Sequence, residues 1–357
     1  MINKMFVRLI LFSLVLCSSA LAQKGGEASA DNTKAMRGQW KSMDKDGDGK
    51  IAKDEATGLM ARFFDRNDED KDGFLDDLEL KSLAKRLAAS RENTQREPRR
   101  KNSNKMPVPE GVTFIGDIAY REGNKAWKLD LAMPDERTDK ACPAIVFIHG
   151  GGWRNGDKSS PAFANPNLEF AAEGYVCINV NYRLGEPKAN CIKDVKCAVR
   201  WLRAHAEEYN VDPERVGAYG NSAGAHLVTM LGICPASADL EGDGPWKEYS
   251  SMVQAVVASA TPTVPRLGRG VEGDVKKIQP MSYISADAPP FLLVHEESDR
   301  TVNVSNSDNF VKGLKEAGAK DVTYIRLTDG SGHGTFQRNI KTTGPAREAF
   351  FKRVLMK

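Results

Sequence analysis

The chain has 357 residues, of which 41% are hydrophobic and 28% are charged, as in an ordinary soluble globular protein. This length has room for one α/β domain of about 250 residues and a small accessory module. A formal net charge of +3 is too small to argue for binding to nucleic acid or to a membrane surface, so no nucleic-acid partner is expected.

The first 22 residues are predicted to be a signal peptide. Two basic residues precede an apolar run over residues 9–17, and residues 20–22 (Ala-Leu-Ala) offer the small–x–small pattern that signal peptidase cleaves. The run is shorter than the roughly 20 residues that span a bilayer, so no membrane span is expected. Cys17 leaves lipoprotein processing open, although Leu16 is bulky where a small residue is expected. We expect cleavage after Ala22 and export to the periplasm or the medium.

An exported protein can form disulfides, but five cysteines remain after cleavage, and an odd number leaves at least one thiol unbridged. Cys142 and Cys177 lie in or beside apolar runs and are expected to be buried as small hydrophobic residues. A bridge that uses Cys191, Cys197 or Cys234 stays open, and no cysteine spacing suggests zinc.

Three short segments follow the signal peptide. Residues 23–35 are small and polar and are interpreted as a flexible leader, and residues 36–90 form an acidic module. Residues 91–106 are basic and lack apolar periodicity, which predicts a solvated linker, with contact to an acidic glycan or cell surface left open.

Residues 44–55 match the 12-residue calcium loop of an EF-hand. Gly49 permits the sharp turn, and Ile51 is expected to pair with its counterpart in a neighbouring loop. Ala52 cannot ligate, so a water molecule is expected in its place. The candidate ligands are Asp44, Asp46, Asp48, the backbone carbonyl of Lys50, and Glu55.

Residues 68–79 repeat the pattern. With both glycines and both terminal glutamates present, an ordinary solvated acidic surface is a poor alternative. The pair is similar to the compact EF-hand pairs of exported bacterial proteins, and its shortness is also similar to dockerins, so docking stays open. We expect bound Ca²⁺, in a structural rather than a sensing role. The candidate ligands are Asp68, Asp70, Asp72, the backbone carbonyl of Phe74, Asp76 and Glu79.

From residue 107 to 357, short β-rich runs alternate with helical stretches, one of them expected over residues 194–209. Apolar runs of this kind predict an α/β domain with a mostly parallel sheet and helices on both faces. In such sheets the active site forms beyond the carboxyl ends of the strands. The expected strands lie within residues 144–148, 176–180, 215–219, 291–294 and 322–327.

A nucleophile elbow, G-x-S-x-G, stands at residues 220–224 between a strand and a helix. Glycines are needed on either side of Ser222 because side chains there would collide with the neighbouring strand and helix. A second motif, His-Gly-Gly-Gly, follows an apolar strand at residues 149–152. Unobstructed backbone N–H groups stabilise an oxyanion, so Gly151, Gly152 and Ala223 are the candidate donors. We expect His149 to order this loop.

A serine nucleophile needs a histidine base and an orienting carboxylate. His333 lies on a small-residue loop after a strand and is the candidate base. Asp299 is the first choice for the acid and Glu297 the second. The order Ser222, Asp299, His333 is the one that α/β-hydrolases use. The other mature histidines are expected in structural positions, and these are His149, His205, His226 and His295.

Residues 108–357 resemble the bacterial esterase/lipase family that contains feruloyl and acetyl-xylan esterases and relatives of hormone-sensitive lipase. The segments that carry the resemblance are residues 148–153, 181–184, 199–203, the elbow, 288–291, 299–302 and 332–334. The resemblance implies the α/β-hydrolase fold and hydrolysis of carboxylic esters, often on acylated plant polysaccharides. The chain departs from the usual sequence of this family in two places. Beside the candidate acid, Glu296-Glu297 replaces the more usual Gly-Asp or Gly-Thr, and residues 258–281, which help to shape the acyl and alcohol pockets, differ in sequence and length.

The predicted function is therefore an exported serine esterase with an acyl-enzyme mechanism, a small-molecule or glycan ester as substrate and no cofactor for the chemistry. A serine peptidase of the same fold is an alternative, against which the His-Gly-Gly-Gly loop and the lack of a propeller domain argue. A non-catalytic, calcium-dependent docking protein is a second alternative, and labelling of Ser222 by a fluorophosphonate separates it from an enzyme.

Overall fold

The computed structural model divides the chain into two compact units, residues 1–100 and residues 101–357. It describes residues 40, 42–57, 60–61, 64–68, 70–83, 107–267 and 272–356. The expected signal peptide, leader and basic linker lie outside these residues.

The N-terminal unit pairs its two acidic loops through a short ladder. Strands β1 (Ile51–Ala52) and β2 (Phe74–Leu75) are antiparallel, with Ile51 opposite Leu75. Helix α3 (Phe64–Asn67) lies between the loops in sequence. Leu75 holds the same position in the second loop as Ile51 holds in the first, so the expected pairing of Ile51 with its counterpart is present. Both side chains are buried. The buried core of this unit consists of Met43, Ile51, Ala56, Met60, Phe64, Leu75 and Leu80.

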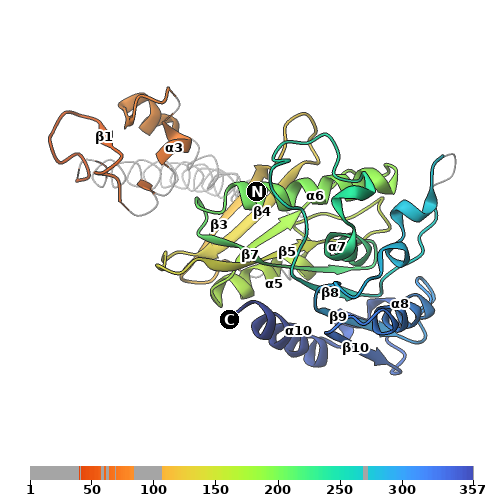
Figure 1. The fold of residues 1–357 in the computed structure, drawn as a ribbon. Coiled ribbons are helices and arrows are strands. Elements are labelled where there is room, and N and C mark those ends of the chain that lie inside the picture. The colour runs from red at the N-terminus through yellow and green to blue at the C-terminus, as the bar shows by residue number, and fades with distance from the viewer. Residues whose placement is uncertain are drawn as a thin grey trace, which may run out of the picture. The chain divides into compact units, whose positions relative to one another are not determined.

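The C-terminal unit is built on one eight-stranded sheet in the order β10-β9-β8-β7-β5-β6-β4-β3 (Figure 1). β3 pairs antiparallel with β4 and β4 with β6, whereas all other neighbours are parallel. The bounds are β3 (Val112–Ala119), β4 (Lys128–Pro134), β5 (Cys142–Ile148), β6 (Val176–Val180), β7 (Val211–Asn221), β8 (Ala255–Ser259), β9 (Phe291–Glu296) and β10 (Val322–Leu327).

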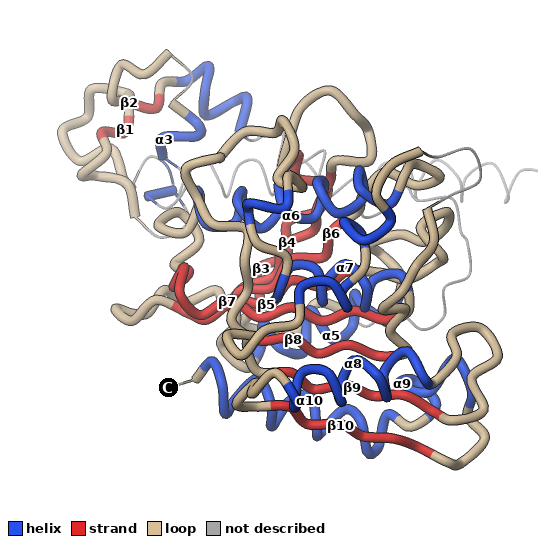
Figure 2. The backbone as a smooth tube through the Cα atoms, turned by 45° about the vertical axis from the view of Figure 1, so that its right-hand side comes forward, coloured by secondary structure: helices blue, strands red, loops and turns tan. Residues whose placement is uncertain are grey.

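Helices cover both faces of this sheet (Figure 2). On one face, α5 (Pro161–Ala172), α9 (Thr335–Arg338) and α10 (Ile340–Leu355) contribute aromatic side chains to a core shared with Phe147 and Tyr219. On the other lie α6 (Lys188–Ala204), α7 (Ala223–Ile233) and α8 (Ser305–Glu316). Short 3₁₀ helices are η1 (Ala236–Ala238), η2 (Val275–Ile278), η3 (Pro280–Tyr283) and η4 (Gly332–Gly334).

The predicted α/β fold with a mostly parallel sheet is confirmed, because β5, β6, β8 and β9 are apolar runs that are almost wholly buried between two helical layers. The helix expected over residues 194–209 is α6, which runs from Lys188 to Ala204. Apolar spacing located its buried face but not its ends. Pro187 directly precedes the helix. His205 directly follows it, and Nδ1 of its ring hydrogen-bonds to the carbonyl of Trp201.

The described cysteines form no disulfide, and all of them except the half-buried Cys142 are buried. No helix in the described ranges combines the length and apolarity that crossing a membrane would require.

Candidate active site

Three side chains from distant parts of the chain meet beyond the carboxyl ends of the parallel strands. Ser222 stands between β7 and α7, Asp299 follows β9, and His333 lies in η4 after β10. The hydroxyl of Ser222 donates a hydrogen bond to Nε2 of His333 over 3.0 Å. Nδ1 of His333 donates to Oδ2 of Asp299 over 2.8 Å. The imidazole therefore bridges the hydroxyl and the carboxylate, which is the arrangement that a serine nucleophile needs.

The backbone at Ser222 is strained. Its φ of 55° and ψ of −120° lie in a region that residues other than glycine rarely adopt. The glycines on either side make this turn possible. A Cβ at Gly220 would collide with the backbone of Gly224 in α7, and a Cβ at Gly224 would collide with the carbonyl of Ile148 in β5. The sharp strand–turn–helix connection places Ser222 in the lining of a cavity, and the residue is 9% exposed.

The Asp299 side chain is fully buried and surrounded by donors. Its Oδ1 accepts the N–H groups of Thr301 over 2.8 Å and Val302 over 3.0 Å. Burial works to raise the pKa of Asp299, but the hydrogen bonds from Val302, His333 and Thr301 outweigh it and leave the pKa below its ordinary value. The carboxylate therefore stays ionised beside the imidazole.

His295, which was expected in a structural position, contacts the candidate acid, Asp299. It is fully buried, but its Nε2 lies 3.2 Å from Oδ2 of Asp299 and 3.0 Å from the carbonyl of Val302. Both partners accept hydrogen bonds only, so Nε2 carries the proton, and Nδ1 accepts from the hydroxyl of Ser307 over 2.7 Å. His295 thus gives Asp299 a further donor. A signal was present in the sequence, since a buried apolar strand ends in two polar residues, His295 and Glu296.

Glu296 connects the acid and base loops. Its Oε2 accepts the N–H of Gly332 over 2.8 Å and both the N–H and the hydroxyl of Ser298, at 2.9 and 2.5 Å. Its Oε1 accepts the N–H of Gly330 over 3.1 Å. The hydrogen bond from the Ser298 hydroxyl leads the interactions that hold the pKa of Glu296 below its ordinary value. Glu296, where the family usually has glycine, therefore places a carboxylate in contact with the loop that carries His333.

Glu297, the second choice for the acid, lies elsewhere. It is exposed, and its carboxylate pairs with Arg326 of β10 over 2.9 Å. The structure therefore brings Asp299, and not Glu297, into hydrogen-bond contact with His333.

The glycine loop after β5 reaches the same end of the sheet. Gly151 has a φ of 110°, and a Cβ there would collide with the backbone of Asn155. Within the described residues, the N–H groups of Gly151, Gly152 and Ala223 donate to no other group, so they stay available to a ligand. The ring of His149 stacks on Tyr182 with 4.5 Å between centroids, and the Tyr182 hydroxyl donates to the His149 carbonyl over 3.0 Å.

His226 supports this loop from α7. The ring is fully buried, and burial lowers its pKa to about 4, so it is neutral near pH 7. Its Nδ1 accepts from the indole N–H of Trp153 over 3.3 Å, and its Nε2 donates to the carbonyl of Ile278 over 2.8 Å. The His226 imidazole is thereby committed to holding Trp153, which agrees with the structural position expected for it.

A cavity of about 690 Å³ opens at Ser222. Gly152 and Trp153 line it from the glycine loop, and Thr301 and Val302 line it from the acid loop. The divergent segment after β8 and the first residue of α6 complete the lining, which includes Pro262, Pro265, Arg266, Leu267 and Lys188.

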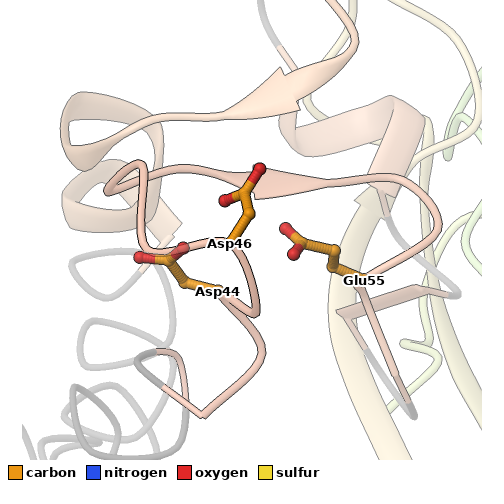
Figure 3. Close-up of side chains that lie close together, drawn as sticks. All are labelled: Asp44, Asp46 and Glu55. Carbon is orange, nitrogen blue, oxygen red and sulfur yellow. The ribbon is translucent and has the colours of Figure 1, made fainter.

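The two acidic loops of the N-terminal unit each bring carboxylates together. Carboxylate oxygens of Asp44, Asp46 and Glu55 lie within 4.8 Å of one another, and so do those of Asp68, Asp70 and Glu79 (Figure 3 shows the first group). Gly49 and Gly73 have φ of 86° and 87°, the sharp turn expected of them. Oδ1 of Asp68 is buried without a hydrogen-bond partner within the described residues. Oxygen donors of this kind fit a hard cation such as Ca²⁺.

The other expected ligands stand in the same loops. Side chains of Asp48 and Asp72 accept backbone N–H groups two residues further on, and so does that of Asp76. The ammonium of Lys50 pairs with Asp72 over 3.2 Å. The backbone carbonyls of Lys50 and Phe74, the remaining candidate ligands, directly precede the paired residues Ile51 and Leu75.

The sequence profile of the BD-FAE family matches residues 129–264 and 267–314, a stretch that includes the elbow and Asp299. The chain belongs to the BD-FAE family. Beyond this family match, the chain is 31% identical to the probable carboxylic ester hydrolase LipM of Mycobacterium tuberculosis and 28% identical to esterase LipC of that organism. These alignments cover 59% and 62% of this chain, and 54% and 60% of the relatives, so the chain spans little more than half the length of the curated relatives it matches.

Two solved structures that resemble this chain are also esterases. A truncated carbohydrate esterase from gut microbiota superposes with a TM-score of 0.62 at 25% identity, covering 71% of this chain and all of that one. Thermogutta terrifontis esterase 2 phosphorylated by paraoxon superposes with a TM-score of 0.60 at 27% identity, covering 70% and 95%. The BD-FAE unit of this protein is therefore an esterase domain with the α/β-hydrolase fold.

Proposed function

We propose that the whole protein is an exported serine esterase in which Ser222, His333 and Asp299 form the catalytic triad. The observation that carries the proposal is the unbroken hydrogen-bond chain from the Ser222 hydroxyl through His333 to Asp299, at the mouth of a cavity. The esterases among its relatives and structural neighbours support the same reaction class.

In this mechanism His333 removes the proton from Ser222 as the hydroxyl oxygen attacks the ester carbonyl. The N–H groups of Gly151, Gly152 and Ala223 stabilise the oxyanion, and one such donor is worth about 3 to 4 kcal/mol in other hydrolases. His333 then protonates the leaving alcohol, which leaves an acyl-serine. Water, deprotonated by His333, attacks the acyl group, and His333 then returns the proton to Ser222 as the acid is released. Asp299 holds the neutral imidazole in the tautomer that has its proton on Nδ1, and it stabilises the imidazolium that forms when Nε2 takes a second proton.

Hydrolysis of 4-nitrophenyl acetate and labelling by a fluorophosphonate probe test the triad. The wild type should show both activities, and Ser222→Ala should lose both. Ser305→Ala, which removes an exposed hydroxyl at the start of α8, is the matched control and should behave as the wild type. A Ser222→Ala variant with wild-type turnover would reject the assignment.

The natural substrate is an acyl ester of a carbohydrate. The carbohydrate esterase among the structural neighbours supports this class, and so does a cavity large enough for an acyl group and a sugar ring. A panel of acetyl, butyryl, long-chain and feruloyl esters, run beside acetylated xylo-oligosaccharides, tests it. Turnover of long-chain esters alone would contradict a carbohydrate substrate.

Ca²⁺ occupies the two acidic loops and stabilises the N-terminal unit. The crowded carboxylates and the unpartnered Oδ1 of Asp68 support this, because bound cations remove their mutual repulsion. Calorimetric titration should detect calcium binding, and excess chelator should lower the melting temperature. Glu55→Gln with Glu79→Gln should abolish binding, whereas Asp54→Asn, which changes an exposed acid of the first loop, should preserve it. Absence of binding by the wild type would refute the role. Docking through this unit stays a prediction.

Export follows from cleavage of residues 1–22. N-terminal sequencing of the protein secreted or released from the periplasm should begin at Gln23. A mature protein that begins with a lipid-modified Cys17 would instead establish the lipoprotein alternative.

A further inference from the structure

The described lining of the cavity at Ser222 contains basic side chains and no acidic one. Within its described lining, Lys188 and Arg266 are the charged residues, and the rest are apolar or neutral. Arg266 is exposed at the rim, whereas Lys188 is half-buried as the first residue of α6. An ester whose carbonyl lies at Ser222 therefore occupies a space lined by two cationic side chains.

Lys188 lacks the partner that other enclosed lysines have. In the described part of the chain, its ammonium makes one hydrogen bond, a long one of 3.4 Å to the carbonyl of Leu267, and forms no ion pair. It also lies 4.8 Å from the centroid of a Trp153 ring. Burial lowers the pKa of Lys188, which means that its charged form is incompletely compensated.

The contrast with two other lysines is direct. The ammonium of Lys158 lies 2.7 Å from a carboxylate oxygen of Asp130, and that of Lys196 lies 2.6 Å from Glu241. In both cases a carboxylate offsets the loss of hydration. Lys188 instead lines the cavity and has no carboxylate partner among the described residues. A ligand bound in the cavity can supply that carboxylate.

We propose that this cavity selects esters that carry a carboxylate group, held by Lys188 with Arg266 at the rim. The inference rests on the proposed esterase function and names the chemistry of its substrate. The carboxylate has two sources: the acyl side, as in a monoester of a dicarboxylic acid, or the alcohol side, as in an acylated uronic acid. Both place an anion near the ammonium while the ester carbonyl meets the nucleophile.

Two matched substrate pairs distinguish these sources. For the acyl side, kcat/KM is compared between 4-nitrophenyl hemiglutarate and 4-nitrophenyl pentanoate, whose acyl chains have the same number of carbons. For the alcohol side, acetate release is compared between acetylated oligogalacturonides and acetylated xylo-oligosaccharides. The wild type should favour the anionic member of at least one pair by about tenfold, as one hydrogen bond to a charged group implies. Added salt should weaken that preference.

Variants connect the preference to the side chain. Lys188→Met should remove most of the preference and Arg266→Met a smaller part, whereas Lys188→Arg should keep it. Lys312→Met is the charge-matched control, since Lys312 is exposed on α8 outside the cavity lining. A wild type that favours the neutral ester in both pairs, or a Lys188→Met variant that keeps the anionic preference, would overturn the proposal. Hydrolysis of 4-nitrophenyl pentanoate would still support the esterase, and its absence would instead count against the proposed function.

Discussion

Replacing Glu296 by glutamine tests how the protein positions its catalytic base. The glutamate oxygens accept four hydrogen bonds, from Ser298 twice, from Gly332 and from Gly330. Glutamine has nearly the same shape, but one of its two terminal groups is an NH₂ donor. In whichever orientation it packs, that donor faces at least one N–H group.

The less damaging orientation keeps the carbonyl oxygen toward Gly332 and Ser298. The NH₂ group then faces the N–H of Gly330, 3.1 Å from the position of Oε1. Two donors at that distance repel, so the loop residues before His333 must move. The hydrogen bond from the Ser222 hydroxyl to His333 is already 3.0 Å long, and misplacement of a catalytic group by about 1 Å costs on the order of a hundredfold in rate. We expect kcat to fall about ten- to a hundredfold, with KM nearly unchanged.

Steady-state kinetics on 4-nitrophenyl acetate and the rate of fluorophosphonate labelling measure this effect. Glu297→Gln is the matched control, because it changes the neighbouring exposed glutamate in the same way. It should stay within about twofold of the wild type, which would also eliminate Glu297 as the acid. Wild-type kcat in Glu296→Gln, or a loss that appears in KM alone, would refute the positioning argument.

Three further predictions follow from the site. Asp299→Asn should lower kcat by about 10⁴-fold without unfolding the protein, as loss of the orienting carboxylate does in other triads; wild-type turnover would contradict the acid assignment. Hydrogen bonds hold the pKa values of Glu296 and Asp299 below their ordinary range. The two ionised carboxylates therefore contribute their full stabilisation of the folded state above about pH 4.5, and this contribution is lost as the pH falls through the lowered pKa values. Denaturant melts from pH 6 to pH 2 should show this fall, and Asp299→Asn should flatten it. Gly224→Ala should destabilise the unit by about 3 kcal/mol or more, because the added Cβ meets the backbone of Ile148, and a variant with an unchanged melting temperature would exclude that collision.

The sequence alone was sufficient where the chemistry is local. The elbow around Ser222 and the two acidic loops depend on residues within about a dozen positions of each other, and their turns follow from glycine at particular places. The alternation of apolar strands and helices likewise predicted the layered sheet, since burial on both faces demands such runs.

The tertiary structure decided which distant groups meet. Glu297 and Asp299 lie two residues apart in sequence, yet only Asp299 points to His333, because β9 and the turn after it set the direction of each side chain. The contacts of Glu296 with Gly330 and Gly332 depend in the same way on the parallel pairing of β9 with β10, which brings the two strand ends together. Strand pairing joins residues far apart in the chain, and no local pattern encodes that proximity.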